Sequence, residues 1–555
     1  MFYLYDLTTY TKNYGAISPT DTDEDEKECH DLLRDPNSSS SYWSDDEDDT
    51  ADDEKEEDAV ESAWQSRRRR RRKRRKERLL NIDEAVQSLG MGIFQYRIAL
   101  AAGMLLAADS MEVVILSYLS SVFRANNPMM MNPVAAENNV DTMNMVVFPA
   151  GVAGALVWGM LGDMIGRRKV FNGAAAMVAV FGVLTAFVNS YQWLLVTRLL
   201  VGFGIGGLTV PFCTFSEFLP PSQRGTNLIC VQVFCIVGAL LVHLTLQQQA
   251  LDAWRKVVVF FSIPSILALA LGMTVVPESP RWLLAQDRQD EALAILRVAA
   301  KANGKDPAVL FPAGTMLYSH EPQEPRNAIL TLFSSAWLQL TSIISSTYFG
   351  MAFLNHGTIS LAVSVFSKDH RQQDYQAVFI AGSHFLSLFV VVFLIDGFGR
   401  ASTQCLSYAV GGLLCLTISL LEDCPPGSTS PNLLLVLTFL SHTCMFGGKC
   451  ATWISTTEIL ATEMRTTGHG LANAFSRIGG VLSACVISRI YSLPSIGLAL
   501  FVLSLWTASA ASKLPETNVK EMGVVYYPLV SSNHIHRRRR AAACSSSAPS
   551  SGNRY

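Results

Sequence analysis

The segment GDMIGRR (Gly162–Arg168) follows a long apolar run, and a matching segment, IDGFGR (Ile395–Arg400), follows another apolar run far later in the chain. Each has an aspartate followed by a glycine three residues on and an arginine four residues on. Two further segments, EFLPPSQRG (Glu217–Gly225) and EILATEMRTTG (Glu458–Gly468), each place an arginine seven residues after a glutamate. Two spacings that recur in the same order predict a chain built from two related halves.

The composition indicates a membrane protein. Of 555 residues, 49% are hydrophobic and 16% are charged, and the mean hydropathy is +0.25, which is too apolar for an ordinary soluble domain. Apolar stretches of spanning length recur twelve times, six on each side of a polar segment that begins at Pro277. We therefore predict an all-α membrane protein with twelve transmembrane helices in two six-helix bundles. The predicted spans are 97–121, 143–162, 170–189, 192–216, 227–248, 257–276, 338–364, 375–396, 402–421, 432–455, 470–490 and 495–513.

Polar segments flank and separate the two bundles. A basic run, Arg67–Arg78, precedes the first span, and further arginines recur in alternate loops, so the positive-inside rule predicts that both termini are cytosolic. The same run could contact anionic lipid headgroups, and we expect no nucleic-acid partner. The predicted parts are a disordered tail (1–85), the N-terminal bundle (86–276), a cytosolic linker with an amphipathic helix (277–336), the C-terminal bundle (337–515) and a second disordered tail (516–555).

Several motifs resemble a known family. GMLGDMIGRRK (Gly159–Lys169) resembles the loop signature of the major facilitator superfamily, and VPESPRWLL with LPET resembles its sugar-porter branch. The stretch IDEAVQSLGMGIFQYRIALAAGMLLAADSMEVVILS is similar to the synaptic vesicle 2-related subgroup, which also contains niacin and organic-ion transporters. The resemblance implies a transporter that works by alternating access in a plasma or vesicle membrane. We expect no enzyme activity, metal or cofactor, and a monomer.

In the family, charged loop residues form ion pairs that link the two halves when the cytosolic side is closed. A second interpretation is that the arginines only fix the topology of the chain. By motif position, the resemblance assigns to this cytosolic gate Gly159, Asp163, Arg167, Glu217, Arg224, Glu278, Arg281, Asp396, Arg400, Glu458 and Arg465.

The first span contains two carboxylates, Asp109 and Glu112, whose spacing puts them on one helical face. A charge near the bilayer centre costs about 2.5–3.5 kcal/mol, so we predict that both face a watery pathway. The alternative is a buried acid that ties helices together. Proton-coupled sugar porters pair a first-span acid with a fourth-span arginine, and the resemblance assigns these roles to Asp109 and Arg198. Glu112 would share the proton or contact the substrate.

The expected substrate contacts lie mainly in the second half. Lys449 and Trp453 are four residues apart and share a helical face, and Trp453 matches the pocket tryptophan of sugar porters. Arg477 matches a basic position of the organic-ion relatives, or it pairs internally with Glu458. His356 either meets a substrate carboxylate or bridges helices, and Trp453 either stacks on the substrate or packs in the core. The full predicted set is Gln232, Asn355, His356, Lys449, Trp453 and Arg477.

Charges of opposite sign across one cavity suit a small organic anion or zwitterion such as nicotinate. Hexose porters carry paired glutamines in span seven, whereas this chain has Gln339 alone, so a hexose is disfavoured. We therefore predict a proton-coupled transporter of a small organic solute. The alternative is a non-transporting membrane receptor or trafficking protein that keeps the fold.

Overall fold

The computed structural model describes residues 79–126, 133–246, 254–321, 327–366, 376–422, 430–487, 489–490, 493–518 and 522–523. Nearly all of both predicted tails, including Arg67–Arg78, lies outside these residues. The two termini lie outside them as well, so their predicted location in the cytosol stays a prediction. Within the described ranges the chain is mainly helical. A short parallel strand pair joins β1 (Leu79–Asn81) to β2 (Met316–Tyr318).

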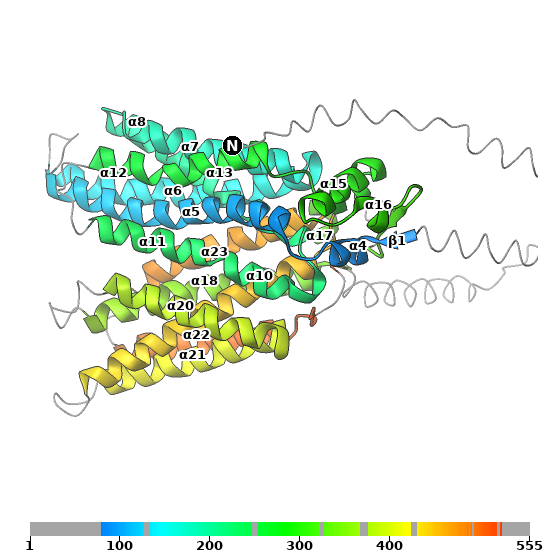
Figure 1. Cartoon of the computed structure of the whole chain (residues 1–555). Coiled ribbons are helices and arrows are strands. Elements are labelled where there is room, and N and C mark those ends of the chain that lie inside the picture. Colours follow the sequence, from blue (N-terminus) through cyan, green and yellow to red (C-terminus); the bar gives the residue numbers. More distant parts are fainter. Residues whose placement is uncertain are drawn as a thin grey trace, which may run out of the picture. The chain divides into compact units, whose positions relative to one another are not determined.

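Every predicted span overlaps one helix or two consecutive helices, which Figure 1 shows running alongside one another. The first half contains α5 (Ile93–Asn126), α6 (Pro133–Ile165), α7 (Arg167–Thr185), α8 (Tyr191–Gly206) with α9 (Thr209–Glu217), the turn η1 (Pro221–Gln223) with α10 (Arg224–Val231) and α11 (Val233–Leu246), and α12 (Trp254–Phe261) with α13 (Ile263–Thr274). The second half contains α18 (Leu338–Phe366), α20 (Gln376–Gly397), α21 (Arg400–Glu422), α22 (Pro431–Ile459), α23 (Arg465–Ile487) and α24 (Leu493–Ala511).

Eleven segments in the described part of the chain are long and apolar enough to cross a membrane, and α18 is not among them. Its 29 residues give a length of about 43 Å, which is sufficient for a bilayer. Its sequence, however, includes glutamine, asparagine, histidine and many hydroxyl side chains. Because α18 packs against α22, α23 and α24, much of this polar surface faces protein. Its role as the twelfth span remains a prediction.

The two quoted loop motifs have the same local structure. Gly166 and Gly399 have φ angles of +103° and +92°, which residues with a Cβ rarely adopt. Each glycine lets the chain turn directly from one long helix into the next. A Cβ at Gly166 would collide with the carboxylate of Glu278, and one at Gly399 with that of Glu516. These carboxylates accept hydrogen bonds of 2.7 and 2.8 Å from the first backbone N–H groups of α7 and α21, so they cap both helices.

A small group of elements covers one end of the bundles (Figure 1). It consists of α4 (Ile82–Leu89), α14 (Pro280–Ala285), α15 (Gln289–Ala302), α16 (Pro307–Leu310), α17 (Ala328–Leu332) and the two strands. Asn303 fixes this group to α5, because its Nδ2 donates to Gln95 Oε1 (2.9 Å) and its Oδ1 accepts from the Phe94 N–H (3.1 Å). We call this end, where Arg224 and Arg465 begin α10 and α23, the arginine end.

Two helix interfaces account for much of the contact between the two halves. Helix α6 of the first half packs against α23 of the second, and α10 and α11 pack against α20. Glycines permit the first contact: a Cβ at Gly159 would meet the Thr466 carbonyl, and one at Gly470 would meet the Ala155 carbonyl. Small residues therefore bring the backbones of α6 and α23 close together.

Candidate functional site

Two ion pairs cross between the halves at the arginine end. Arg465 Nη1 of α23 lies 2.6 Å from Glu217 Oε1 of α9, and Arg224 Nη1 of α10 lies 3.9 Å from Glu458 Oε1 of α22. All four side chains are buried. The seven-residue spacing found in the sequence therefore pairs each glutamate with the arginine of the opposite half.

The first corner comprises Asp163, Arg167, Glu217 and Arg465. Arg167 Nη2 lies 3.1 Å from Asp163 Oδ1 and 3.5 Å from Glu217 Oε1, and it also donates to the Thr462 carbonyl in the second half.

Asp163 adds more contacts across the same interface. It accepts hydrogen bonds from the N–H groups of Thr466 (3.3 Å) and Thr467 (2.7 Å) and from the Thr467 hydroxyl (2.7 Å). The Gly159 carbonyl accepts a bond from the Thr466 hydroxyl (2.7 Å). The first corner is thus a closed, buried contact between α6, α9 and the start of α23.

The second corner comprises Asp396, Arg400, Glu458 and Arg224. Arg400 lies 3.0 Å from Asp396 Oδ1 through Nη1 and 3.0 Å from Glu458 Oε2 through Nε. Asp396 Oδ2 also accepts a bond of 2.7 Å from the Thr226 hydroxyl of the first half. The Asp396 side chain is 30% exposed, so this corner is the more open of the two.

Two carboxylates that the sequence analysis did not single out complete the arginine end. Asp83 of α4 lies 2.5 Å from Arg281 Nη2 and 3.2 Å from Arg224 Nη2. Burial alone would raise the pKa of Asp83, but Arg281 and Arg224 outweigh burial and hold it below its usual value. Glu321 Oε1 lies 3.3 Å from Arg465 Nη2 and 3.6 Å from Arg281 Nη1. Neither carboxylate belongs to the repeated motifs, so spacing gave no signal for them.

The sequence analysis led us to expect an ion pair between Arg198 and Asp109. In the structure, Arg198 pairs with Glu112 instead. Arg198 Nη1 lies 2.7 Å from Glu112 Oε2, and the two side chains are 2% and 3% exposed. The guanidinium also donates from Nε to the Thr185 hydroxyl at the end of α7 (3.1 Å). A three-residue offset turns the two acids about 60° apart around α5. Glu112 therefore points into the first half, where Arg198 lies.

Asp109 instead faces Arg477 of the second half. The distance from Asp109 Oδ1 to Arg477 Nη2 is 3.8 Å, and the side chains are 26% and 18% exposed. Arg477 Nη2 also donates to the Ile205 carbonyl of α8 (3.2 Å), so this arginine reaches across the interface. Among the described residues, neither Asp109 Oδ1 nor Arg477 Nε has a hydrogen-bond partner. The expected alternative of an Arg477–Glu458 pair is absent, because Glu458 pairs with Arg400.

Lys449 adds a second cation near this pair. It lies within electrostatic range of Asp109 and of His356, and its ammonium is 5.4 Å from the centroid of the Phe446 ring. In the part of the chain that the structure describes, Lys449 forms no ion pair. The neighbouring polar residues of α18 bond to their own helix, with His356 Nδ1 2.9 Å from the Ala352 carbonyl and Asn355 Nδ2 2.8 Å from the Met351 carbonyl.

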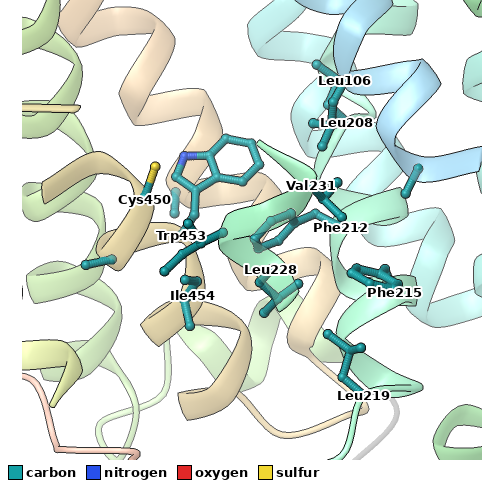
Figure 2. Close-up of a cluster of buried hydrophobic side chains, with 14 of the residues drawn as sticks. Leu106, Leu208, Phe212, Phe215, Leu219, Leu228, Val231, Cys450, Trp453 and Ile454 are labelled. Carbon is teal, nitrogen blue, oxygen red and sulfur yellow. The ribbon is translucent and has the colours of Figure 1, made fainter. Parts of the chain in front are cut away.

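Trp453 lies where the halves meet, toward the arginine end from Lys449. Its ring centroid is 5.4 Å from that of Phe212 in α9 and 5.0 Å from that of His469 in α23. Figure 2 shows the indole of α22 beside Phe212. The indole Nε1 is buried and has no hydrogen-bond partner among the described residues. Gln232, the remaining predicted contact, is buried at the junction of α10 and α11.

Comparison with known proteins identifies the family. Residues 85–521 match the family described as "Sugar (and other) transporter". The chain belongs to this family. It is 30% identical over 450 residues to organic cation/carnitine transporter 7 of Arabidopsis thaliana, covering 73% of this chain and 87% of the relative. It is 27% identical over 461 residues to the synaptic vesicle 2-related protein of Bos taurus, covering 78% and 80%.

Solved structures show the same fold. The proton:xylose symporter XylE bound to 6-bromo-6-deoxy-D-glucose has a TM-score of 0.61 at 20% identity and covers 79% of this chain and 99% of that chain. The human organic anion transporter MFSD10 has a TM-score of 0.55 at 16% identity and covers 75% and 99%. These findings confirm the expected major facilitator fold, the resemblance to synaptic vesicle 2-related and organic-ion transporters, and a membrane transporter rather than an enzyme.

Proposed function

We propose that the chain carries a small organic anion or zwitterion across its membrane by alternating access, with protons as the coupling ion. The observation that carries the proposal is the Asp109–Arg477 pair. It joins the two halves, keeps part of its surface exposed and leaves hydrogen-bonding groups on both side chains unused. A bound solute can take these groups without breaking a tight ion pair.

The balance of charge favours a negatively charged group on the solute. Arg198 neutralises Glu112, so Arg477 and Lys449 stand near the single carboxylate of Asp109. One positive charge is left over, and an uncompensated charge inside a membrane protein is costly. A solute carboxylate, such as that of nicotinate, lowers this excess of positive charge whether or not Asp109 carries a proton, whereas a neutral hexose does not. Two similar proteins named for organic cation/carnitine and organic anion transport are in keeping with a charged solute.

The same pair suggests how a proton is coupled to the solute. When Asp109 binds a proton it no longer attracts Arg477, which is then free to hold the carboxylate of the solute. Loss of the proton restores the attraction and releases the solute. Proton and anion therefore bind best together, which is the requirement for symport.

The arginine end acts as the gate in this proposal. The positive-inside rule assigns it to the cytosol, in a plasma or vesicle membrane. The crossed pairs Glu217–Arg465 and Arg224–Glu458 hold it closed, and both must separate before the solute can leave toward that side. The buried gate residues would therefore control the rate of transport more than the choice of solute.

Uptake into proteoliposomes tests the function. Radiolabelled nicotinate, carnitine, a short dicarboxylate and glucose are compared with and without an inward proton gradient. We expect uptake of at least one charged solute, raised several-fold by the gradient, and none of glucose. Tight binding of one solute without uptake of any would contradict transport and favour a receptor or trafficking role.

Two substitutions test the roles in the pair. Asp109→Asn is expected to leave uptake insensitive to the proton gradient, and Arg477→Gln to lower uptake at least tenfold. Asp287→Asn is the matched control for the first, because Asp287 is exposed and its φ of 59° suits asparagine. Arg288→Gln, in an exposed pair with Glu291, is the control for the second. A full gradient response in Asp109→Asn would contradict the coupling role.

A further inference from the structure

We propose that His469 is a positioning residue: as a neutral ring it ties the two halves together and holds the indole of Trp453, and its protonation favours opening of the arginine end. The proposal rests on the proposed function, because it describes how the same site is closed.

Three buried side chains from three helices form a hydrogen-bonded latch. His469 Nδ1 of α23 lies 3.2 Å from Cys213 Sγ of α9, and His469 Nε2 lies 2.8 Å from Tyr348 Oη of α18. All three are fully buried. A neutral imidazole has one donor and one acceptor, and a thiol or a hydroxyl can supply the complement of either. The neutral ring is therefore satisfied on both sides, and it joins the first half to the second.

The same ring supports Trp453. The His469 and Trp453 centroids are 5.0 Å apart at 73°, and Phe212 lies 6.1 Å from His469 at 77°. Tyr348 completes the enclosure, with its ring centroid 6.3 Å from that of Trp453. The two contacts that His469 makes with Trp453 and Phe212 are edge-on, a favoured geometry for aromatic pairs. A displacement of His469 therefore moves the indole of Trp453, which is a predicted substrate contact.

The surroundings of the latch disfavour a charged imidazole. On α23, the same helix as His469, Arg465 lies one turn closer to the arginine end. On α9, Glu217 lies one turn beyond Cys213, and its carboxylate is already paired with Arg465 at 2.6 Å. Helix α18 presents the neutral Tyr348. On α22, Trp453 is neutral and Lys449, one turn further, is cationic.

Beyond these elements, Asp163 and Arg167 of α6 pair with each other at 3.1 Å. No carboxylate among the described residues forms an ion pair with His469. Burial of an unpaired charge costs several kcal/mol, so the latched ring stays neutral.

Opening the arginine end parts α9 from α23 and exposes His469 to water. A water-exposed histidine has a pKa of about 6.5, so the open state binds a proton there and the closed state does not. Acid therefore favours the open state. Lowering the pH from about 7.5 to about 5.5 is expected to raise the ratio of open to closed protein about tenfold.

Hydrogen–deuterium exchange of the full-length protein in lipid nanodiscs tests this without any solute. The peptides of interest cover residues 209–223 and 459–475, and rates are corrected for the intrinsic effect of pH. We expect these peptides to exchange about tenfold faster at pH 5.5 than at pH 7.5. Because no solute is needed, failure of the transport assay leaves this result interpretable.

Variants separate titration from packing. His469→Gln keeps a hydrogen-bonding side chain that cannot titrate, so the acid effect should disappear while the protein stays closed. His469→Ala and Tyr348→Phe should exchange faster at both pH values, because the latch is weakened. His243→Gln, at an exposed histidine of α11, is the matched control and should respond to acid as the unchanged protein does. An acid response that persists in His469→Gln, or none in the unchanged protein, would overturn the proposal.

Discussion

The two corners of the arginine end are built from the same residue types, but they close to different degrees. In the first corner, Glu217 and Arg465 lie 2.6 Å apart and their side chains are fully buried. In the second corner, Arg224 and Glu458 lie 3.9 Å apart, and Asp396 is 30% exposed. A repeated motif thus gives equal local structure without giving equal contact between the halves.

The second corner also relies on a residue from outside the repeat. Arg224 lies closer to Asp83, at 3.2 Å, than to its cross-half partner, Glu458. Asp83 belongs to α4, which precedes the first span and follows β1. We infer that the first corner carries most of the free energy of closure and that the segment before the first span tunes the second.

The largest expected effect is at the centre of the first corner. Glu217→Gln leaves Arg465 and Arg167 without their shared buried carboxylate and should lower the free energy of unfolding by about 3–5 kcal/mol. Glu458→Gln is the matched change in the second corner. Arginines keep a second carboxylate in both variants: Arg465 keeps Glu321 and Arg167 keeps Asp163 in the first corner, as Arg400 keeps Asp396 and Arg224 keeps Asp83 in the second. Glu458→Gln should nevertheless cost less, about 1.5–3 kcal/mol, because the second corner is more open, with 3.9 Å between Arg224 and Glu458 and with Asp396 30% exposed. Thermal unfolding of the purified protein measures both, and equal losses would remove the proposed asymmetry.

Asp83→Asn should destabilise the second corner by about 1.5–3 kcal/mol, because two arginines lose a charged acceptor. The folded pKa of Asp83 is depressed, so its contribution is present above its unfolded pKa of about 3.9 and is lost as the pH falls through the lower folded value. The loss should therefore be constant between about pH 5 and pH 8. Glu84→Gln, at an exposed neighbour, is the control. A loss that fades below pH 7 would indicate that Asp83 is not held by the arginines.

The glycine turns test the comparison from the other side, because substitutions at the two turns are expected to have similar effects on stability. Gly166→Ala and Gly399→Ala are each expected to lower stability by about 1–3 kcal/mol, since a Cβ is strained at positive φ and collides with a capping glutamate. Gly304→Ala isolates the strain, because Gly304 has a φ of +73° and no atom within 4 Å of the added Cβ. Thermal unfolding should show a smaller loss of stability for Gly304→Ala than for the other two variants. A larger loss at Gly304 would show that the glutamate side chains move aside at little cost.

The smallest expected effect is at the exposed edge of the second corner. Asp396→Asn should cost no more than about 1 kcal/mol, since a partly solvated ion pair contributes little and Arg400 keeps Glu458. Asp163→Asn, at the equivalent position, should cost more because three hydrogen bonds from α23 converge on a buried carboxylate. Unfolding of the two variants side by side provides the measurement. A reversed order would contradict the burial argument.

Sequence patterns predicted the fold well, because membrane spans and repeated loop motifs leave strong local signals. Helix α18 shows the limit of the hydropathy signal, since many of its polar side chains bond to carbonyls of their own helix while α18 packs against neighbouring helices. The spacing between Glu217 and Arg224 marked both residues, but only the structure shows that each pairs with the opposite half.

Partner choice inside the bundles was harder to predict. Asp109 and Glu112 share a helical face, so spacing alone could not decide which acid meets Arg198 and which meets Arg477. Asp83, Glu321 and His469 carried no repeated or periodic signal, because their contacts come from segments far apart in the sequence.

The polarity of α18 also bears on how the chain enters its membrane. A helix with polar groups near its centre partitions poorly from the translocon into lipid by itself, because each such group adds to its insertion free energy. The helices that shield α18, namely α22, α23 and α24, are all synthesised after it. Stable insertion of α18 must therefore wait for its later neighbours, and a nascent chain that stops just beyond residue 366 should fail to anchor it.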